Sequence, residues 1–262
     1  MVAIIWMTIS CPLQAAFETQ NIAVRYHALA GAGCAAQNDP SMMLQNPASS
    51  HGSHSLYLYA SFSRLYNTDI HSSALVGAFD CKNHMINLGV LSLGNELYHE
   101  TTCVVGISKS IRPAMCVGIN TRLGQLSIAG YGEARMAALD LGLQVKILNG
   151  LYFGSTITNC LGANIGKEPL PQGMQSGFHA LLSPRWSLHF DIFKDVDFAT
   201  DIRCGAEYSP FSSLTLRLGT GTKPSRFAAG FGLLIHNLSI EYGFDSHLTL
   251  GLTHQCALAL VL

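Results

Sequence analysis

The stretch HLTLGLTHQCALALVL (247–262) alternates between two kinds of side chain at almost every step. Its even positions from 248 onward are mostly Leu, whereas its odd positions carry Thr, Gly, Gln, Ala and Val. Successive side chains of a β-strand point to opposite faces, so a period of two indicates a strand with two unlike faces. The stretch therefore predicts a long β-strand over 248–261 with one apolar face and one polar or small face.

The same alternation recurs along the chain from Ser53 onward and predicts an all-β protein of about 14 strands, with 12 as the alternative. Most predicted strands are close to the 9–11 residues that a tilted strand needs to cross a membrane. The gaps after odd-numbered strands are longer than the gaps after even-numbered strands, an asymmetry typical of outer-membrane barrels. The predicted spans are 54–63, 72–80, 84–93, 99–108, 114–123, 135–147, 150–160, 176–182, 186–193, 201–208, 213–219, 226–234, 238–244 and 248–261.

The composition is apolar and poor in charge. The chain has 262 residues, of which 48% are hydrophobic and only 12% are Asp, Glu, Lys or Arg. The net charge of −1 argues against a basic nucleic-acid binder. Beyond the N-terminus no apolar run reaches the roughly 18 residues of a membrane helix. A transmembrane antiparallel β-barrel and a soluble all-β protein with a large core remain as the two interpretations.

The polar face of the strands favours the membrane barrel. The exterior of a soluble protein is usually rich in Lys and Glu, whereas this face carries mainly Gly, Ser, Thr and Asn with a few charges of both signs. Charges of opposite sign on neighbouring strands can pair inside a lumen; ordinary solvated strand charges are the alternative. The residues predicted to form a polar network in the lumen are Asp201, Arg203, Glu207, Arg217, Glu241 and Asp245.

The N-terminal part differs from the strands. Residues 1–13 are apolar and small residues follow at Ala15 and Ala16, so we expect a secretory signal over 1–16. Residues 21–52 show little alternation and contain the turn signals Asp39-Pro40 and Asn46-Pro47. The interior of a barrel this wide is not filled by wall side chains, so a segment folded into the lumen is physically useful. A flexible tail is the alternative for this segment.

The segment GAGCAAQNDPSMMLQNPAS (31–49) resembles the N-terminal segment of FadL-type and PorV/PorQ-type outer-membrane proteins. The resemblance is carried by a motif of Asp, Ser and Asn-Pro-Ala. It implies a 14-stranded barrel closed by an N-terminal plug or hatch, with 17–52 as the plug and 53–262 as the barrel. FadL-type proteins pass fatty acids and other hydrophobic molecules, whereas PorV-type proteins serve the type IX secretion system. The motif residues here are Asp39, Ser41, Asn46, Pro47 and Ala48.

No motif for a nucleophile elbow, a nucleotide-binding loop or a zinc protease is present in the sequence. We therefore expect no enzymatic activity, no cofactor and no metal site. The predicted function is an integral protein of a bacterial outer membrane that is exported through the inner membrane, contacts outer-membrane lipid and passes or binds small hydrophobic molecules. The alternatives are a non-transport component of protein secretion or surface attachment, with secretion-system proteins as partners, and a soluble secreted all-β binding protein.

Overall fold

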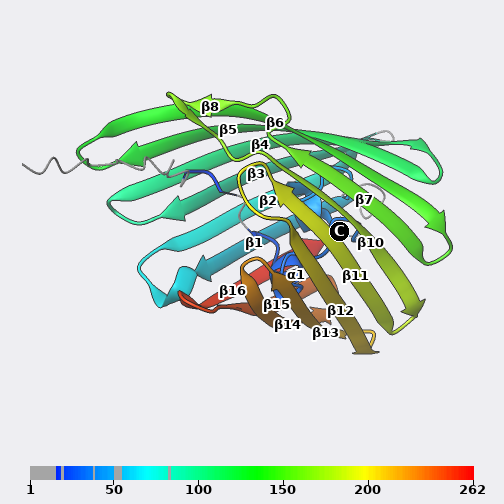
Figure 1. Cartoon of the computed structure of the whole chain (residues 1–262). Coiled ribbons are helices and arrows are strands. Elements are labelled where there is room, and N and C mark those ends of the chain that lie inside the picture. Colours follow the sequence, from blue (N-terminus) through cyan, green and yellow to red (C-terminus); the bar gives the residue numbers. More distant parts are fainter. Residues whose placement is uncertain (1–15, 19–20, 38, 50–54, 82–83) are drawn as a thin grey trace, which may run out of the picture.

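Fourteen antiparallel strands close into a barrel in the computed structural model, which describes residues 16–18, 21–37, 39–49, 55–81 and 84–262 (Figure 1). Each barrel strand pairs with its neighbours along the chain, and β1 closes the barrel against β16. The predicted fold class is therefore confirmed, with 14 strands rather than 12. The barrel strands are β1 Leu56–Arg64, β2 His71–Cys81, β3 His84–Gly94, β4 Tyr98–Arg112, β5 Met115–Ile128, β6 Gly132–Leu148, β7 Leu151–Thr158, β10 Gly173–Ser183, β11 Trp186–Asp195, β12 Asp201–Phe211, β13 Leu214–Thr222, β14 Ser225–Ile235, β15 Leu238–His247 and β16 Gly251–Val261.

Three short elements lie outside the barrel wall or at its edge. The strands β8 (Asn164–Ile165) and β9 (Glu168–Pro169) form a two-stranded hairpin between β7 and β10. A short 3-10 helix, η2 (Leu65–Asn67), follows β1. The sequence predicted a loop where the hairpin lies, because strands of two residues are too short to show alternation.

The two rims of the barrel differ in the length of their connections. At one rim, here called the short-turn rim, two residues connect each pair of strands, at 113–114, 149–150, 184–185, 212–213 and 236–237. At the other, here called the long-loop rim, the connections are 65–70, 95–97, 129–131, 159–172, 196–200, 223–224 and 248–250. All but 223–224 exceed two residues, so the predicted asymmetry is present.

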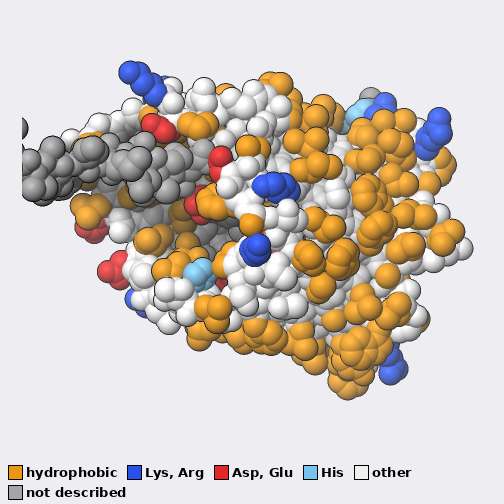
Figure 2. Space-filling model, in the orientation of Figure 1, with side chains coloured by type: hydrophobic (Ala, Val, Ile, Leu, Met, Phe, Trp, Pro, Cys, Tyr) orange, Lys and Arg blue, Asp and Glu red, His pale blue; other side chains and the backbone are white. Residues whose placement is uncertain are grey.

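The strands place apolar side chains outside and polar side chains inside, as β11 shows. Leu188, Phe190 and Ile192 are each 43–45% exposed on the outer face, whereas His189 and Asp191 are buried in the lumen. Figure 2 shows hydrophobic side chains spread over the right-hand part of the wall, while acidic side chains gather on the left around a hollow. A soluble barrel has the opposite arrangement, so this exterior suits contact with lipid. No helix among the described residues is long and apolar enough to cross a membrane.

The N-terminal segment, defined here as the described residues of 21–49, lies inside the barrel. It contains the helix α1 (Val24–Ala28) and the 3-10 helix η1 (Pro40–Leu44), and most of its residues are buried. Figure 1 shows α1 enclosed by the strands, and it contacts β13, β14, β15 and β16.

Glycines in the wall allow the backbone of this segment to approach closely. A Cβ atom added at Gly118 would lie 2.3 Å from the backbone of Pro47, and one at Gly219 would lie 2.2 Å from the backbone of Leu29. Side chains at these positions would therefore collide with the segment. The glycines on the polar face of the strands thus make room for an irregular chain in the lumen.

Candidate functional site

Glu207 of β12 is the centre of a buried cluster of charges. Its carboxylate accepts hydrogen bonds from Arg25 Nη2 at 2.7 Å and from Arg217 Nε at 3.1 Å, and His189 Nε2 lies 3.0 Å away. Arg217 also donates to Glu241 Oε1 at 3.2 Å. Two arginines thus balance two carboxylates, as buried charges require. Burial alone would lower the pKa of Arg25, but Glu207 raises it above its usual value.

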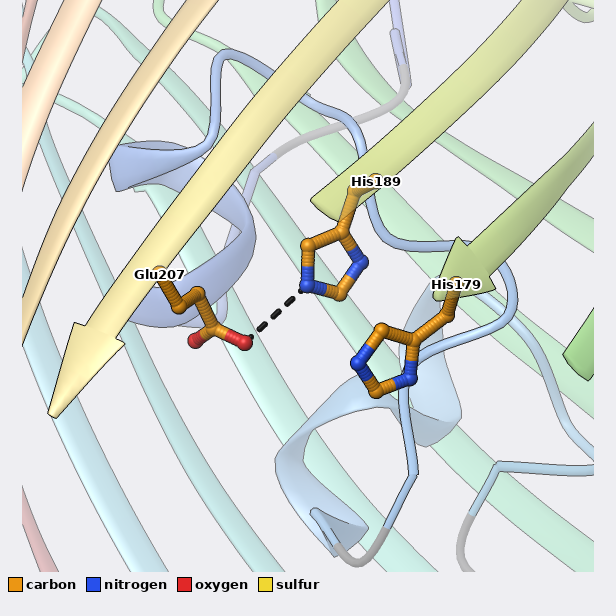
Figure 3. Close-up of side chains that lie close together, drawn as sticks. All are labelled: His179, His189 and Glu207. Carbon is orange, nitrogen blue, oxygen red and sulfur yellow. Dashed lines mark hydrogen bonds and ion pairs between the residues drawn. The ribbon is translucent and has the colours of Figure 1, made fainter. Parts of the chain in front are cut away.

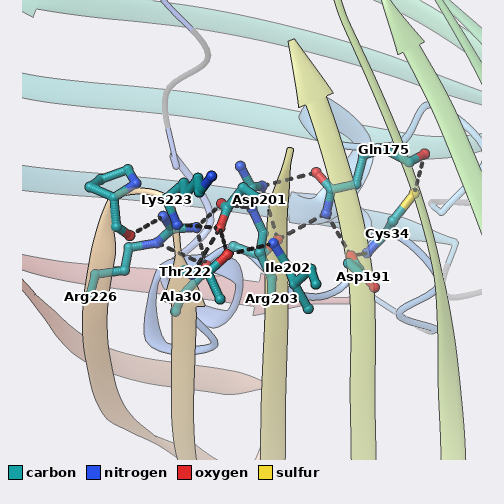
Figure 4. Close-up of polar contacts among 12 residues, drawn as sticks. Ala30, Cys34, Gln175, Asp191, Asp201, Ile202, Arg203, Thr222, Lys223 and Arg226 are labelled. Atoms are coloured by element: carbon teal, nitrogen blue, oxygen red, sulfur yellow. Dashed lines mark hydrogen bonds and ion pairs between the residues drawn. The ribbon is translucent and has the colours of Figure 1, made fainter. Parts of the chain in front are cut away.

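Asp201 is the centre of a second cluster, near the long-loop rim (Figure 4). One of its oxygens accepts from Arg203 Nε and Arg226 Nη2, both at 2.7 Å, and the other accepts from the backbone N–H groups of Thr222 and Lys223, both at 2.9 Å. Arg226 Nη2 also donates to the carbonyl of Ala30 at 2.8 Å. The cluster therefore ties the connection 223–224 and the N-terminal segment to the wall.

Asp191 and Gln175 supply hydrogen-bond partners to the backbone of the segment. Asp191 Oδ2 accepts from the N–H groups of Gly33 and Cys34, both at 2.8 Å. Gln175 Nε2 donates to the carbonyl of Gly31 at 2.9 Å and to Asp191 at 2.6 Å. A buried irregular chain must pair its backbone groups, and here side chains of the wall do so.

The predicted motif of the segment shapes its second half. Asp39 precedes η1, and its carboxylate accepts from the backbone N–H of Ser41 at 3.0 Å. Asn46 Oδ1 accepts from the N–H of Ala48 at 3.0 Å, and Asn46 Nδ2 donates to the carbonyls of Cys34 at 2.7 Å and Leu143 at 3.1 Å. The contacts with Ala48 and Cys34 fix the turn at Asn46-Pro47-Ala48 within the segment, and the contact with Leu143 of β6 holds the turn against the wall.

The six residues predicted for the lumen network all lie on strands and point inward, but in three separate groups. Glu207, Arg217 and Glu241 form one group, and Asp201 pairs with Arg203 in another. Asp245 lies apart from both and faces His27 Nε2 at 3.5 Å.

Sequence reasoning missed several partners of these residues. Those on strands had a usable signal: Ser187, His189 and Asp191 alternate with apolar residues, which marks them as inward-facing. Arg25 lies in the N-terminal segment, where apolar and polar residues do not alternate, so no pattern in the sequence identified it. The missed residues are Arg25, Gln175, His179, Ser187, His189, Asp191 and Arg226.

Two cavities flank the N-terminal segment. A cavity of about 540 Å³ lies at the long-loop rim, where the segment contributes Asn21 to its lining. A cavity of about 340 Å³ lies at the short-turn rim, where the segment contributes Arg25 and Gln37. The first has the size of a small-molecule site and combines apolar with charged walls, formed by Pro171, Phe193, Phe198, Ala199, Arg203 and Arg226.

Comparisons with known proteins bear on the fold. No protein-family model matches the sequence, and no curated protein sequence matches it. The structure is similar to the toluene transporter TodX of Pseudomonas putida, with a TM-score of 0.73 and 11% identity over 94% of this chain and 99% of TodX. It is also similar to the CymD monoaromatic hydrocarbon channel, with a TM-score of 0.72 and 10% identity over 92% of this chain and 97% of CymD.

A FadL homologue of Pseudomonas aeruginosa has a TM-score of 0.65 and 10% identity, over 91% of this chain and 97% of the homologue. At such low identity these similarities show the fold alone. The chain therefore has the barrel fold of FadL-type channels, as the resemblance of residues 31–49 implied.

Proposed function

We propose that this protein is an integral β-barrel of a bacterial outer membrane that passes small hydrophobic molecules. The observation that carries the proposal is a barrel with an apolar exterior and a cavity of about 540 Å³ at the long-loop rim. In outer-membrane barrels the longer loops face outward, so this cavity would receive molecules from outside. TodX and CymD, which are named as a toluene transporter and a monoaromatic hydrocarbon channel, support this class of solute.

The chemistry of the cavity is compatible with an aromatic or aliphatic solute. Phe193 and Phe198 offer apolar surface, and the guanidinium of Arg203 lies 4.2 Å from the centre of the Phe193 ring. Burial of apolar surface contributes roughly 25 cal/mol per Å², so a small hydrocarbon would gain affinity mainly from these rings. The charged side chains at the floor pair with one another and with the N-terminal segment.

In this proposal residues 17–52 are the plug and residues 53–262 the barrel, after a signal over 1–16. The plug role is supported by the burial of the segment between the two cavities and by its hydrogen bonds to the wall. Side chains hold the segment, rather than strand pairing. It can therefore shift to open a path without breaking the barrel. The motif residues Asp39, Ser41, Asn46, Pro47 and Ala48 would preserve the shape of the plug.

The other functions predicted from the sequence have less support. In a soluble secreted protein, the apolar side chains on the outer face of β11 and its neighbours would be exposed to water. An apolar patch of that size is unfavourable on a soluble protein. A role in secretion or surface attachment, as in PorV/PorQ-type proteins, stays a prediction. CymD is named as a channel and TodX as a transporter, so these two structures favour passage of solutes over that role and over catalysis.

Uptake of a labelled monoaromatic hydrocarbon by bacteria that express the chain tests the proposal. Phe198, which is 59% exposed and lines the cavity, is replaced by Asp; the matched control is Phe211→Asp, 68% exposed at the short-turn rim. We expect wild-type cells to take up the solute faster than cells without the protein, and Phe198→Asp to reduce that gain severalfold. Equal uptake with and without the protein, or equal loss in both variants, would contradict the proposal.

A further inference from the structure

Three side chains that can bind a metal ion meet inside the barrel at the short-turn rim. His179 of β10 lies directly opposite His189 of β11, and Glu207 comes from the next strand, β12. One ligand atom of each side chain lies within 4.8 Å of the other two, and all three residues are buried. Figure 3 shows the two imidazole rings side by side, each with a nitrogen on the side facing Glu207.

The two histidines are poorly satisfied as hydrogen-bonding groups. Their rings stack at 4.3 Å with an interplanar angle of 7°. Among the described residues, no hydrogen bond of ordinary geometry reaches either ring nitrogen of His179, although the backbone of Ala35 lies near, and none reaches Nδ1 of His189. Buried polar atoms without partners are unfavourable and rare in native proteins. Stacking accounts for the contact of the rings but leaves these nitrogens without a role.

We propose that His179, His189 and Glu207 form a binding site for a borderline divalent cation, with Zn²⁺ as the reference ion. Two imidazoles and one carboxylate are a ligand set that Zn²⁺ uses when a fourth position stays open. The cavity of about 340 Å³ is lined by His179 and Glu207 and leaves room for a water molecule in that position. The proposal goes beyond passage of hydrophobic molecules and does not depend on it.

The geometry requires only small movements. His189 Nε2 and Glu207 Oε2 are already 3.0 Å apart. Tetrahedral ligands at about 2.0–2.2 Å from Zn²⁺ are roughly 3.3–3.5 Å from one another. The ion would therefore separate His189 from Glu207 slightly and draw a nitrogen of His179 inward.

Arg25 competes with the ion for the same carboxylate oxygen. Arg25 donates from Nη2 to Glu207 Oε2 at 2.7 Å and from Nε to Oε1 at 3.0 Å. Ser187 Oγ also donates to Oε2 at 3.2 Å, and Arg217 Nε donates to Oε1 at 3.1 Å. An ion on Oε2 would displace Nη2 of Arg25 and reduce its two hydrogen bonds with the carboxylate to one, whereas Arg217 would stay on Oε1, where it orients the ligand. Because Arg25 belongs to the N-terminal segment, occupancy of the site and anchoring of the segment oppose each other.

The test is a Zn²⁺ titration of the full chain in detergent micelles against a chromogenic chelator. We expect one Zn²⁺ per barrel, and a loss of affinity of at least about 10-fold in His179→Ala and in His189→Ala, since even outer partners of a ligand cost 10–100-fold. The matched control is His71→Ala: His71 is exposed on β2, stacked on Phe62, and its loss should leave the affinity unchanged. Heat-dependent gel migration shows that each variant retains a folded barrel.

Removal of the competing cation gives a second readout. Arg25→Met should tighten Zn²⁺ binding, because it removes a charged donor from both oxygens of Glu207 and so leaves the carboxylate more available to the ion. Weak binding that falls equally in His71→Ala and His179→Ala would overturn the site, since it would show adsorption to surface histidines. Unchanged affinity in Arg25→Met would overturn the assignment of Glu207 as a ligand. None of these outcomes affects hydrocarbon uptake, so the two proposals fail separately.

Discussion

Replacing Leu218 with Arg should destabilise the barrel in lipid by about 2–4 kcal/mol, the cost of a cation at the middle of a bilayer on the lipid face of a barrel. Leu218 is central in β13 (Leu214–Thr222), points outward and is 55% exposed. Its neighbours across the strands are Ala206 and Ala229, so no acidic side chain is available to pair with the new charge. The folding equilibrium constant should fall about 30- to 700-fold.

The assay is reversible unfolding by guanidinium in lipid vesicles, with Trp186 fluorescence as a readout. Leu148→Arg is the control, because Leu148 is 64% exposed but ends β6 at the short-turn rim. A cation near the interface costs only about 0–1 kcal/mol. If both substitutions caused the same small loss, the exterior would be facing water rather than lipid, and the assignment of the faces would be refuted.

Three further predictions concern the lumen. Gly142→Ala should dislodge the N-terminal segment and raise its sensitivity to protease, because the new Cβ would lie 2.3 Å from Asn46 Oδ1; Gly77→Ala, with its nearest contact at 3.6 Å, should not. Glu207→Gln should reduce the stability of the barrel by about 3–5 kcal/mol, because Arg25 and Arg217 stay buried without the negative charge that pairs with them. It should therefore lower the midpoint of guanidinium unfolding, whereas Glu168→Gln, at an exposed position, should not. Deletion of 21–48 should increase leakage of small hydrophilic solutes through the barrel, and unchanged permeability would count against the plug.

The strands and their faces could be predicted because apolar residues alternate with polar or small residues along each strand. The ends were less accurate. The prediction ended one strand at 108, but β4 continues to Arg112, and it began another at 135, but β6 begins at Gly132. Hydrogen bonding to the neighbouring strand continues there although the side chains no longer alternate between apolar and polar. Backbone pairing therefore extends strands beyond the segment that lipid constrains.

The candidate site was less predictable because its partners come from distant parts of the chain. Arg25 and Glu207 are 182 positions apart, and only closure of the barrel around the segment brings them together. By contrast, His179 and His189 flank the two-residue turn 184–185, so strand register alone could have paired them. Asp245 shows the converse: it has the right alternation and shares β15 with Glu241, but it lies farther along the strand and faces His27 instead of the Glu207 group.

The most direct test of the central claim is the extraction and gel behaviour of the protein expressed in a Gram-negative host. A barrel with this apolar exterior should appear in the outer-membrane fraction, resist extraction with salt or alkali, require detergent for release, and migrate differently on a gel before and after heating. Recovery in the soluble periplasmic fraction without detergent, with no change in migration on heating, would contradict a lipid-embedded barrel.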